Sequence, residues 1–182
     1  MSHLPPPGGY GVPHPAERGT PPPRPGDLVD RLVARLVDWL VVAVVAGLVV
    51  RPLVRALLLG PDSDAVASWV AGATVTVSLA VVALGYQLFF ETTTGRTPGK
   101  ALMGLQVVGQ GGARVTPTQS LRRNAFHLVT LLGLVPFAGP ALASLAEVVV
   151  LAAIAWSIAS DPGLRQGVHD RFARQTYVMK VR

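Results

Sequence analysis

The chain has 182 residues, of which half are hydrophobic, only 14% are charged and none is cysteine. A soluble domain normally carries about 25% charged residues, so this composition is typical of a membrane protein. The absence of cysteine excludes disulfides, thiolate metal sites and cysteine nucleophiles. The formal net charge of +6 does not indicate nucleic-acid binding, because the sequence has neither zinc-finger spacing nor an isolated basic helix.

Residues 1–26 hold nine of the sixteen prolines, five glycines and almost no large apolar side chain. Such a segment cannot bury enough apolar surface to fold, so we expect a disordered cytoplasmic tail. It lacks the basic start, apolar centre and cleavage site of a signal peptide. Its PPPRP run at residues 21–25 fits a polyproline-binding partner, although most such tails are only tethers.

Residues 27–182 are predicted to form an all-α membrane domain with four transmembrane helices. Residues 65–90 contain 26 consecutive residues without a formal charge, and about 20 suffice to cross the hydrocarbon core. A first helix at about 31–51 is also long enough. The apolar stretch at 125–160 is too long for one crossing, at about 54 Å as a single helix. Pro136, Gly139 and Pro140 divide it, so we expect helices at about 121–135 and 141–159.

The positions of the 16 Lys and Arg residues support an even number of crossings. Arg51 and Arg55 lie between the first two helices, and with four crossings the other fourteen cations share one side. The positive-inside rule assigns that side to the cytoplasm, so we expect a multi-pass cell-membrane protein with both termini cytoplasmic. Its basic face would meet anionic lipid headgroups. Two transmembrane helices plus a re-entrant helical hairpin preserve the same sidedness.

Residues 91–124 form the one substantial polar connection. Two short apolar runs, at 101–108 and 113–117, flank the sequence GQGG. This pattern predicts a short β-hairpin or an amphipathic segment at the membrane interface, between the second and third helices. Asp161, Pro162 and Gly163 end the fourth helix, and residues 161–182 are expected to be a basic cytoplasmic tail.

Asp38 is the most unusual residue, because it lies inside the apolar run at 36–50. A carboxylate at membrane depth costs at least about 2.5 kcal/mol, so it usually faces protein and pairs with a cation. Arg31, Arg35 and Asp38 share one face of a helix. Arg35, at i−3, is the better local partner, which leaves Arg31 for a carboxylate elsewhere, such as Asp170 or Glu91.

Three further residues are of chemical types that can bind ions or transfer protons: Glu147, Lys100 and His169. Glu147 either joins Asp38 in a proton or cation path or faces the headgroup boundary. Lys100 ends a basic interfacial turn rather than a phosphate loop, because Ala101 follows it and a membrane helix precedes it. His169 has no nucleophile at a recognisable spacing and no second histidine nearby. We therefore expect no enzymatic activity, no cofactor and no metal site.

Three patterns give the chain a resemblance to a known family. They are Arg31, Ala34 and Asp38; TPGK at residues 97–100 followed by Gly104; and QGVHD at residues 166–170 followed by Thr176. In these patterns the chain resembles the RDD family of small membrane proteins, from about Arg31 to Val181. Arg35 departs from the family pattern, which more often has an apolar or aromatic residue there. The proline-rich N-terminal tail resembles that of actinobacterial members.

The resemblance implies that Arg31, Asp38 and Asp170 are the motif charges of the chain. It supplies no cofactor and no catalytic set, because the family's function is largely unestablished, with suggestions of transport. Two functions follow. In the first hypothesis, the protein transports ions or small solutes through a polar site around Asp38, and a protein of only four helices would then need to form a homo-oligomer. Alternatively, it is a membrane scaffold or interaction protein in which the three charges form a structural ion-pair cluster.

Overall fold

The computed structural model describes residues 24–174 and 176–181. The tail predicted for residues 1–26 therefore lies mostly outside the described residues. Its last three residues belong to the fold. Arg24–Pro25 form strand β1, and the backbone N–H of Gly26 donates to the carbonyl of Val178 at 2.9 Å.

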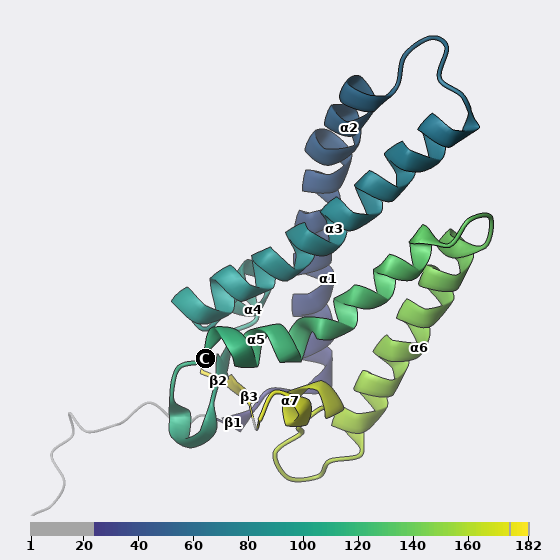
Figure 1. Ribbon diagram of the computed structural model, residues 1–182. Coiled ribbons are helices and arrows are strands. Elements are labelled where there is room, and N and C mark those ends of the chain that lie inside the picture. Colours follow the sequence, from purple (N-terminus) through teal and green to yellow (C-terminus); the bar gives the residue numbers. More distant parts are fainter. Residues whose placement is uncertain (1–23, 175, 182) are drawn as a thin grey trace, which may run out of the picture.

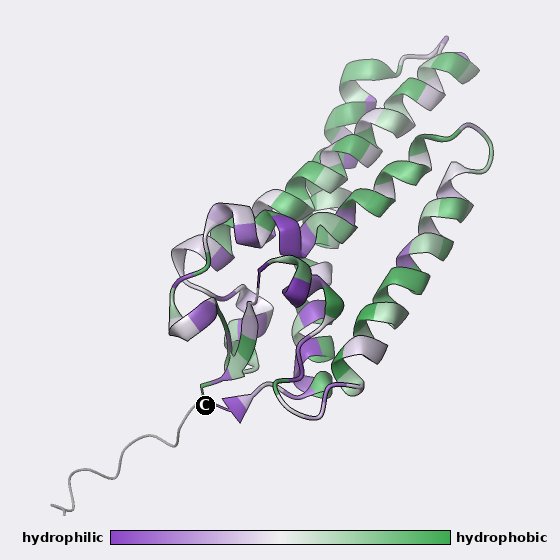
Figure 2. Ribbon diagram, turned by 60° about the horizontal axis from the view of Figure 1, so that its bottom comes forward, coloured by the Kyte–Doolittle hydropathy of each residue, from purple (hydrophilic) through white to green (hydrophobic). Residues whose placement is uncertain are grey.

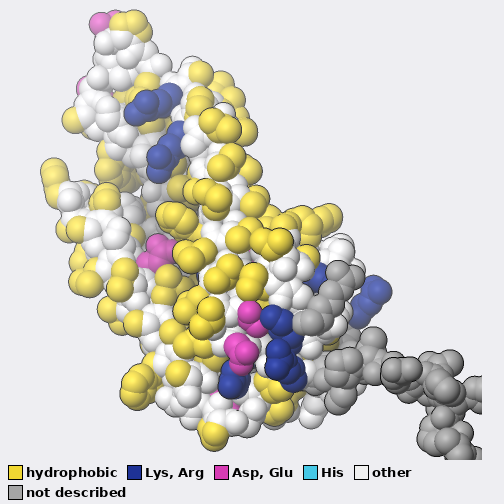
Figure 3. Space-filling view, turned by 180° about the vertical axis from the view of Figure 1, so that it is seen from behind, with side chains coloured by type: hydrophobic (Ala, Val, Ile, Leu, Met, Phe, Trp, Pro, Cys, Tyr) yellow, Lys and Arg dark blue, Asp and Glu magenta, His cyan; other side chains and the backbone are white. Residues whose placement is uncertain are grey.

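Three helices are long and apolar enough to cross a membrane: Leu28–Leu58, α3 (Ala65–Thr93) and α6 (Gly139–Ala159). At 1.5 Å per residue they extend about 46, 43 and 31 Å, against a hydrocarbon core about 30 Å thick. Their outward faces are mostly apolar (Figures 2 and 3). Leu48, Leu57 and Trp156, for example, are 75, 71 and 77% exposed. A surface of this kind belongs in a bilayer.

The first spanning helix is continuous through three segments: α1 (Leu28–Val45), the π-helical turn η2 (Ala46–Val50) and α2 (Arg51–Leu58). Pro52 has no N–H to donate to the preceding turn, and the wider π turn accommodates that break. The predicted end of this helix near residue 51 was wrong. Arg51 and Arg55 lie on its last turns rather than in a loop, where their long side chains can extend toward the membrane surface.

The predicted helix at 121–135 is divided into α5 (Pro117–Asn124) and the 3₁₀ helix η4 (Ala125–Leu134). Thr116 and Gln119 form a capping box that starts α5. At about 2 Å per residue η4 covers only about 20 Å. A turn containing Pro136 joins it to α6, and this pair extends less far than the loop between α2 and α3 (Figures 1 and 2). Three of the four predicted spanning helices are confirmed as apolar helices of spanning length.

The polar segments gather at one end of the helices, which we call the cap: residues 24–27, 94–124, 160–174 and 176–181 (Figure 1). It contains α4 (Pro98–Leu102), β2 (Leu105–Val108), the 3₁₀ turn η3 (Gln110–Gly112), α5, α7 (Val168–Phe172) and β3 (Tyr177–Lys180).

A three-stranded antiparallel sheet of order β1-β3-β2 joins the two ends of the described chain. Residue 105 pairs with 180, and 108 pairs with 177. The apolar run at 101–108 thus pairs with the C-terminal tail and not with residues 113–117, as a local hairpin would require. Leu105, Val107 and Val178 point inward from this sheet and pack with Ala34 of α1. The cap is therefore built directly onto the first membrane helix.

Candidate functional site

Asp38 is buried where α1 meets α3 and α4, and its carboxylate accepts three hydrogen bonds. Oδ1 accepts from the Tyr86 hydroxyl and from the Gly99 backbone N–H, both at 2.8 Å. Oδ2 accepts from the Thr97 hydroxyl at 2.5 Å. The aspartate is only 2% exposed, yet both oxygens are satisfied. Its carboxyl oxygens thus accept from neutral donors rather than from a cation.

The TPGK motif supplies two of these donors because of how α4 begins. Thr97 is the N-cap residue of α4, and its hydroxyl oxygen also accepts from the Lys100 N–H at 3.4 Å. Pro98 follows in the first turn, where its missing N–H costs no hydrogen bond. A Cβ on Gly99 would lie 2.2 Å from the Ala34 carbonyl oxygen. Only glycine lets α4 approach α1 closely enough to reach Asp38.

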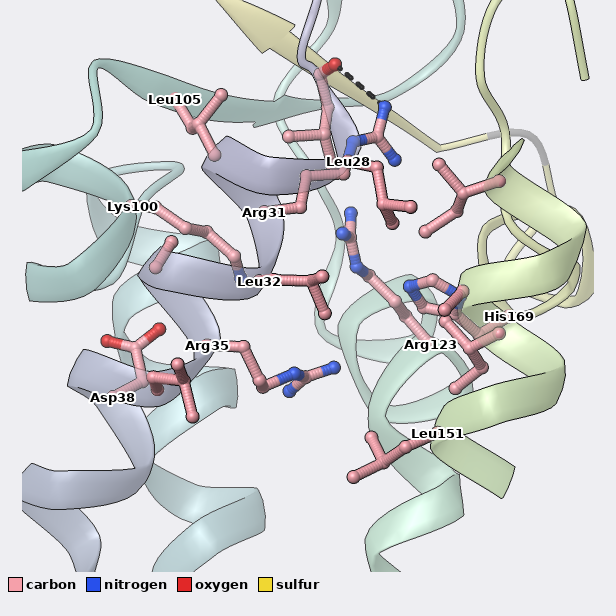
Figure 4. Close-up of a pocket in the computed structure, with 16 residues that line it drawn as sticks. Leu28, Arg31, Leu32, Arg35, Asp38, Lys100, Leu105, Arg123, Leu151 and His169 are labelled. Atoms are coloured by element: carbon pink, nitrogen blue, oxygen red, sulfur yellow. Dashed lines mark hydrogen bonds between the residues drawn. The ribbon is translucent and has the colours of Figure 1, made fainter. Parts of the chain in front are cut away.

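Arg35 is not the partner of Asp38, and that prediction was wrong. The two side chains leave α1 in different directions, and the guanidinium points toward α5 and η4 (Figure 4). Its Nη1 lies 3.4 Å from Nε2 of His127, and its Cζ lies 4.7 Å from the centre of the Phe126 ring. No carboxylate of the described residues lies within ion-pair distance of Arg35.

Of the two carboxylates considered for Arg31, the structure pairs it with Asp170 and not with Glu91. Nη1 of Arg31 lies 3.4 Å from Oδ2 of Asp170, while Nε and Nη2 donate to the carbonyls of Gly26 and Val178 at 3.1 and 3.3 Å. One arginine of α1 thereby holds β1, β3 and α7 together.

Asp170 is fully buried in the first turn of α7, where its Oδ2 also accepts from the Gly167 N–H at 3.3 Å. Burial raises the pKa of its carboxyl, but the attraction of Arg123 and other neighbours outweighs burial and holds the pKa below its ordinary value. The carboxylate is therefore charged, and two arginines face it. Arg123 Nη2 lies 3.3 Å from Oδ1.

Glu91 and Arg123 complete a network that the sequence reasoning missed. Glu91, at the end of α3, lies 2.6 Å from Lys100 Nζ and 3.7 Å from Arg123 Nε. Its second oxygen accepts from Ser120 at 2.8 Å and Asn124 at 3.1 Å. From the sequence, Glu91 is predicted only as one of two carboxylates for Arg31. The available signal was a carboxylate directly after an uncharged spanning run, together with the adjacent cations Arg122 and Arg123 before the next apolar run.

Of the remaining candidates, His169 lies beside Asp170, whereas Glu147 lies apart from these ion pairs. Burial lowers the pKa of His169 to about 3, so its ring is neutral, and its Nε2 lies 3.4 Å from Oδ1 of Asp170. Glu147 is half-buried on α6 and forms no ion pair with a described residue.

Two cavities adjoin the network. The first, of about 280 Å³, lies between α1 and α6, and its charged lining comprises Arg31, Arg35, Lys100, Arg123 and Asp38. The second, of about 410 Å³, lies deeper among the helices, and its polar lining includes Asp38, Gln87, His127, Thr130 and Glu147. Asp38 lines both.

The comparisons with known proteins return one match. A family model described as the RDD family matches residues 25–174, which include Arg31, Asp38, Lys100 and Asp170. No curated protein and no solved structure matches the chain.

Proposed function

The chain belongs to the RDD family, and from that premise we propose that it is a membrane scaffold whose motif charges hold the cap onto the membrane helices. The two motif carboxylates join segments that are distant in sequence. Asp38 joins α1 to α3 and α4, and Asp170 joins α7 to α1 and α5. The proline-rich N-terminal segment, whose last residues enter the cap sheet, would then present a site for a partner protein.

The observation that carries this proposal is that both carboxyl oxygens of Asp38 already accept hydrogen bonds within the protein. A carboxylate that binds a transported ion must exchange its ligands, whereas this one accepts three hydrogen bonds from fixed neutral donors. One of them is a backbone N–H. Such an arrangement favours a permanent contact between elements over a reversible ion site.

The cap is proposed to lie in the cytoplasm of a cell-membrane protein. The cations in the described part of the cap support this side, because the positive-inside rule places an excess of Lys and Arg there. Both α5 and α7 lie in the cap, so η4 and α6 leave it and return as a hairpin (Figure 1). Its short η4 favours the re-entrant form over a full double crossing.

The test compares Asp38→Asn with Thr97→Ala, which keeps the charge of Asp38 but removes its Oδ2 donor. If Asp38 is structural, both variants lower the thermal midpoint of the purified protein and speed tryptic cleavage in the cap. Loss of one hydrogen bond to a charged group costs about 1.5–3 kcal/mol. Asp62→Asn, in the exposed loop between α2 and α3, is the matched control. Unchanged midpoints and cleavage rates for both variants would rule out the scaffold role.

Transport is the second candidate, and the 410 Å³ cavity favours it. Glu147 and Asp38 line this one polar space within the helical region, as a proton or cation path requires. A homo-oligomer would enclose such a path. Purified protein in liposomes would then move cations or protons, and Glu147→Gln would abolish the flux without lowering the thermal midpoint. Liposomes with no flux above the protein-free background would eliminate this candidate.

A further inference from the structure

The 280 Å³ cavity is lined by both cationic and apolar side chains (Figure 4). Four of the lining residues are cationic: Arg35, which has no carboxylate partner in the described chain, and Arg31, Lys100 and Arg123, which are paired with Asp170 or Glu91. The walls of the cavity include Leu32 and Leu36 from α1, and Leu151 and Ile154 from α6. Asp38 is the one carboxylate in the lining, and its oxygens are already engaged.

Two of the cations have unused binding capacity. Arg35 has no carboxylate of the described chain within ion-pair distance, although it is held by Phe126 and His127. Arg123 is only 4% exposed, and its Nη1 has no hydrogen-bond partner in the described structure. The guanidinium groups of both point into the space between α1 and α6 (Figure 4). A buried donor of this kind is costly unless an acceptor meets it. An anion would supply such an acceptor.

A phosphate group suits these donors better than other anions of similar size. The planar guanidinium offers parallel N–H groups that match phosphate oxygens, and Arg35 and Arg123 present two such groups to the same cavity. The volume of about 280 Å³ holds a headgroup but not two acyl chains. The rest of the ligand must leave the cavity.

The apolar wall provides that exit. Leu32, Leu36 and Leu151 are 47, 65 and 38% exposed, so the cavity opens sideways between α1 and α6. The main packing partner of α1 is α4, and that of α6 is η4, which leaves the seam between α1 and α6 loosely filled. The opening lies where these helices leave the cap.

We propose that this cleft binds one anionic phospholipid from the bilayer, with its phosphate on Arg35 and Arg123 and its acyl chains against Leu36 and Leu151. This goes beyond the scaffold role, because it assigns a ligand to a cavity that neither the Asp38 contacts nor the Asp170 pair requires. The lipid would bridge α1 to α6 and thereby join the two halves of the membrane region.

The experiment measures the thermal midpoint of the full chain in a neutral detergent during separate titrations with dioleoyl phosphatidylglycerol, dioleoyl phosphatidylcholine and inorganic phosphate. We expect a saturable rise with phosphatidylglycerol alone, since a ligand that binds only the folded state stabilises it. An equal rise with phosphatidylcholine, or no rise with phosphatidylglycerol, overturns the proposal. A rise with inorganic phosphate that equals the lipid effect identifies a free-phosphate site and also overturns it.

Arg35→Gln tests the assigned contact. It should weaken the apparent phosphatidylglycerol affinity about tenfold or more, the effect of losing a charge-assisted hydrogen bond. Arg114→Gln removes the same charge from an exposed position in the cap and should leave the affinity unchanged. If Arg35→Gln fails to fold, Leu151→Trp fills the apolar exit and should abolish the rise. Lipid effects that persist in Arg35→Gln, or in Leu151→Trp where it replaces that variant, overturn the proposal.

Discussion

At the scale of single residues, the three buried carboxylates of the described chain are each stabilised by a different set of partners. Asp38 is met by neutral donors, Glu91 by Lys100 with hydroxyl and amide groups, and Asp170 by two arginines. All are at most 2% exposed. A buried charge persists only when its lost hydration is replaced, and removal of one partner leaves the other uncompensated. These residues therefore connect segments of the chain that are distant in sequence.

Gly99 is the position at which the addition of a single methyl group should disturb the contact between α4 and α1. In Gly99→Ala the new Cβ would lie 2.2 Å from the Ala34 carbonyl oxygen and 2.8 Å from Asp38 Oδ1, so α4 must move away from α1. We expect a loss of about 1–3 kcal/mol in the free energy of unfolding, as for other overpacked sites. Denaturant titration of the purified protein measures it.

Gly85→Ala is the matched control, because a Cβ there has no neighbour within 4 Å and the residue lies inside α3. Alanine is favoured over glycine in a helix by about 1 kcal/mol, so this change should be neutral or stabilising. Equal effects at the two glycines would contradict the close approach of α4 to α1.

His169 should make the protein less stable in mild acid. Burial lowers its pKa to about 3, while an unfolded histidine titrates near the ordinary value of 6.5. Between these values the unfolded state binds a proton that the folded state does not, so stability falls as the pH falls from 6.5 toward 3. The slope from this one group is at most about 1.4 kcal/mol per pH unit.

Thermal midpoints between pH 7 and pH 5 measure this slope, and His169→Gln should reduce it. The window avoids Asp170, whose lowered pKa lets it contribute fully above its ordinary value of 3.8 and lose its contribution only in stronger acid. The same slope in His169→Gln as in the unchanged protein would show that the ring is not buried in its neutral form.

At the scale of elements, the cap depends on pairing between segments far apart in sequence. The four residues of β2 pair with residues of β3 that lie 69 to 75 positions later, and the core under this sheet is completed by Ala34 of α1. The C-terminal tail is thus part of the fold over residues 168–174 and 176–181. A sheet this small is stable only because a helix covers its face.

Leu105 is the residue through which the sheet depends on that helix. It is fully buried, so Leu105→Ala should lower the free energy of unfolding by about 2–5 kcal/mol. Leu102→Ala makes the same chemical change three residues earlier, where the side chain is 72% exposed, and should cost far less. The comparison uses denaturant titration, and a similar loss in both variants would refute the placement of the cap core.

At the scale of the whole molecule, the arrangement predicts which segments share a side of the membrane. Because the chain has no cysteine, single cysteines can be labelled without background. Ser63→Cys, between α2 and α3, should react with a membrane-impermeant maleimide on intact cells. Gly163→Cys, in the cap, should react only after permeabilisation. The reverse pattern would contradict a cytoplasmic cap.

Phe137→Cys, in the exposed turn between η4 and α6, distinguishes the two forms of the hairpin. A re-entrant hairpin predicts no labelling from outside intact cells, since η4 covers only about 20 Å of a core about 30 Å thick. Labelling as efficient as that of Ser63→Cys would instead establish two full crossings.

The sequence by itself determined the membrane character, the existence of three apolar helices of spanning length, the break at Pro136 and, through the family motifs, that Arg31, Asp38 and Asp170 are the motif charges. These follow from local hydrophobicity, backbone chemistry and short patterns. Only the tertiary structure decided that Tyr86, Thr97 and Gly99 meet Asp38, that Arg123 bridges Glu91 and Asp170, and that β2 pairs with β3. The physical reason is the same in each case. A buried polar group can be satisfied by any partner that folding brings within reach, and nothing in the local pattern names a partner 32 or more residues away.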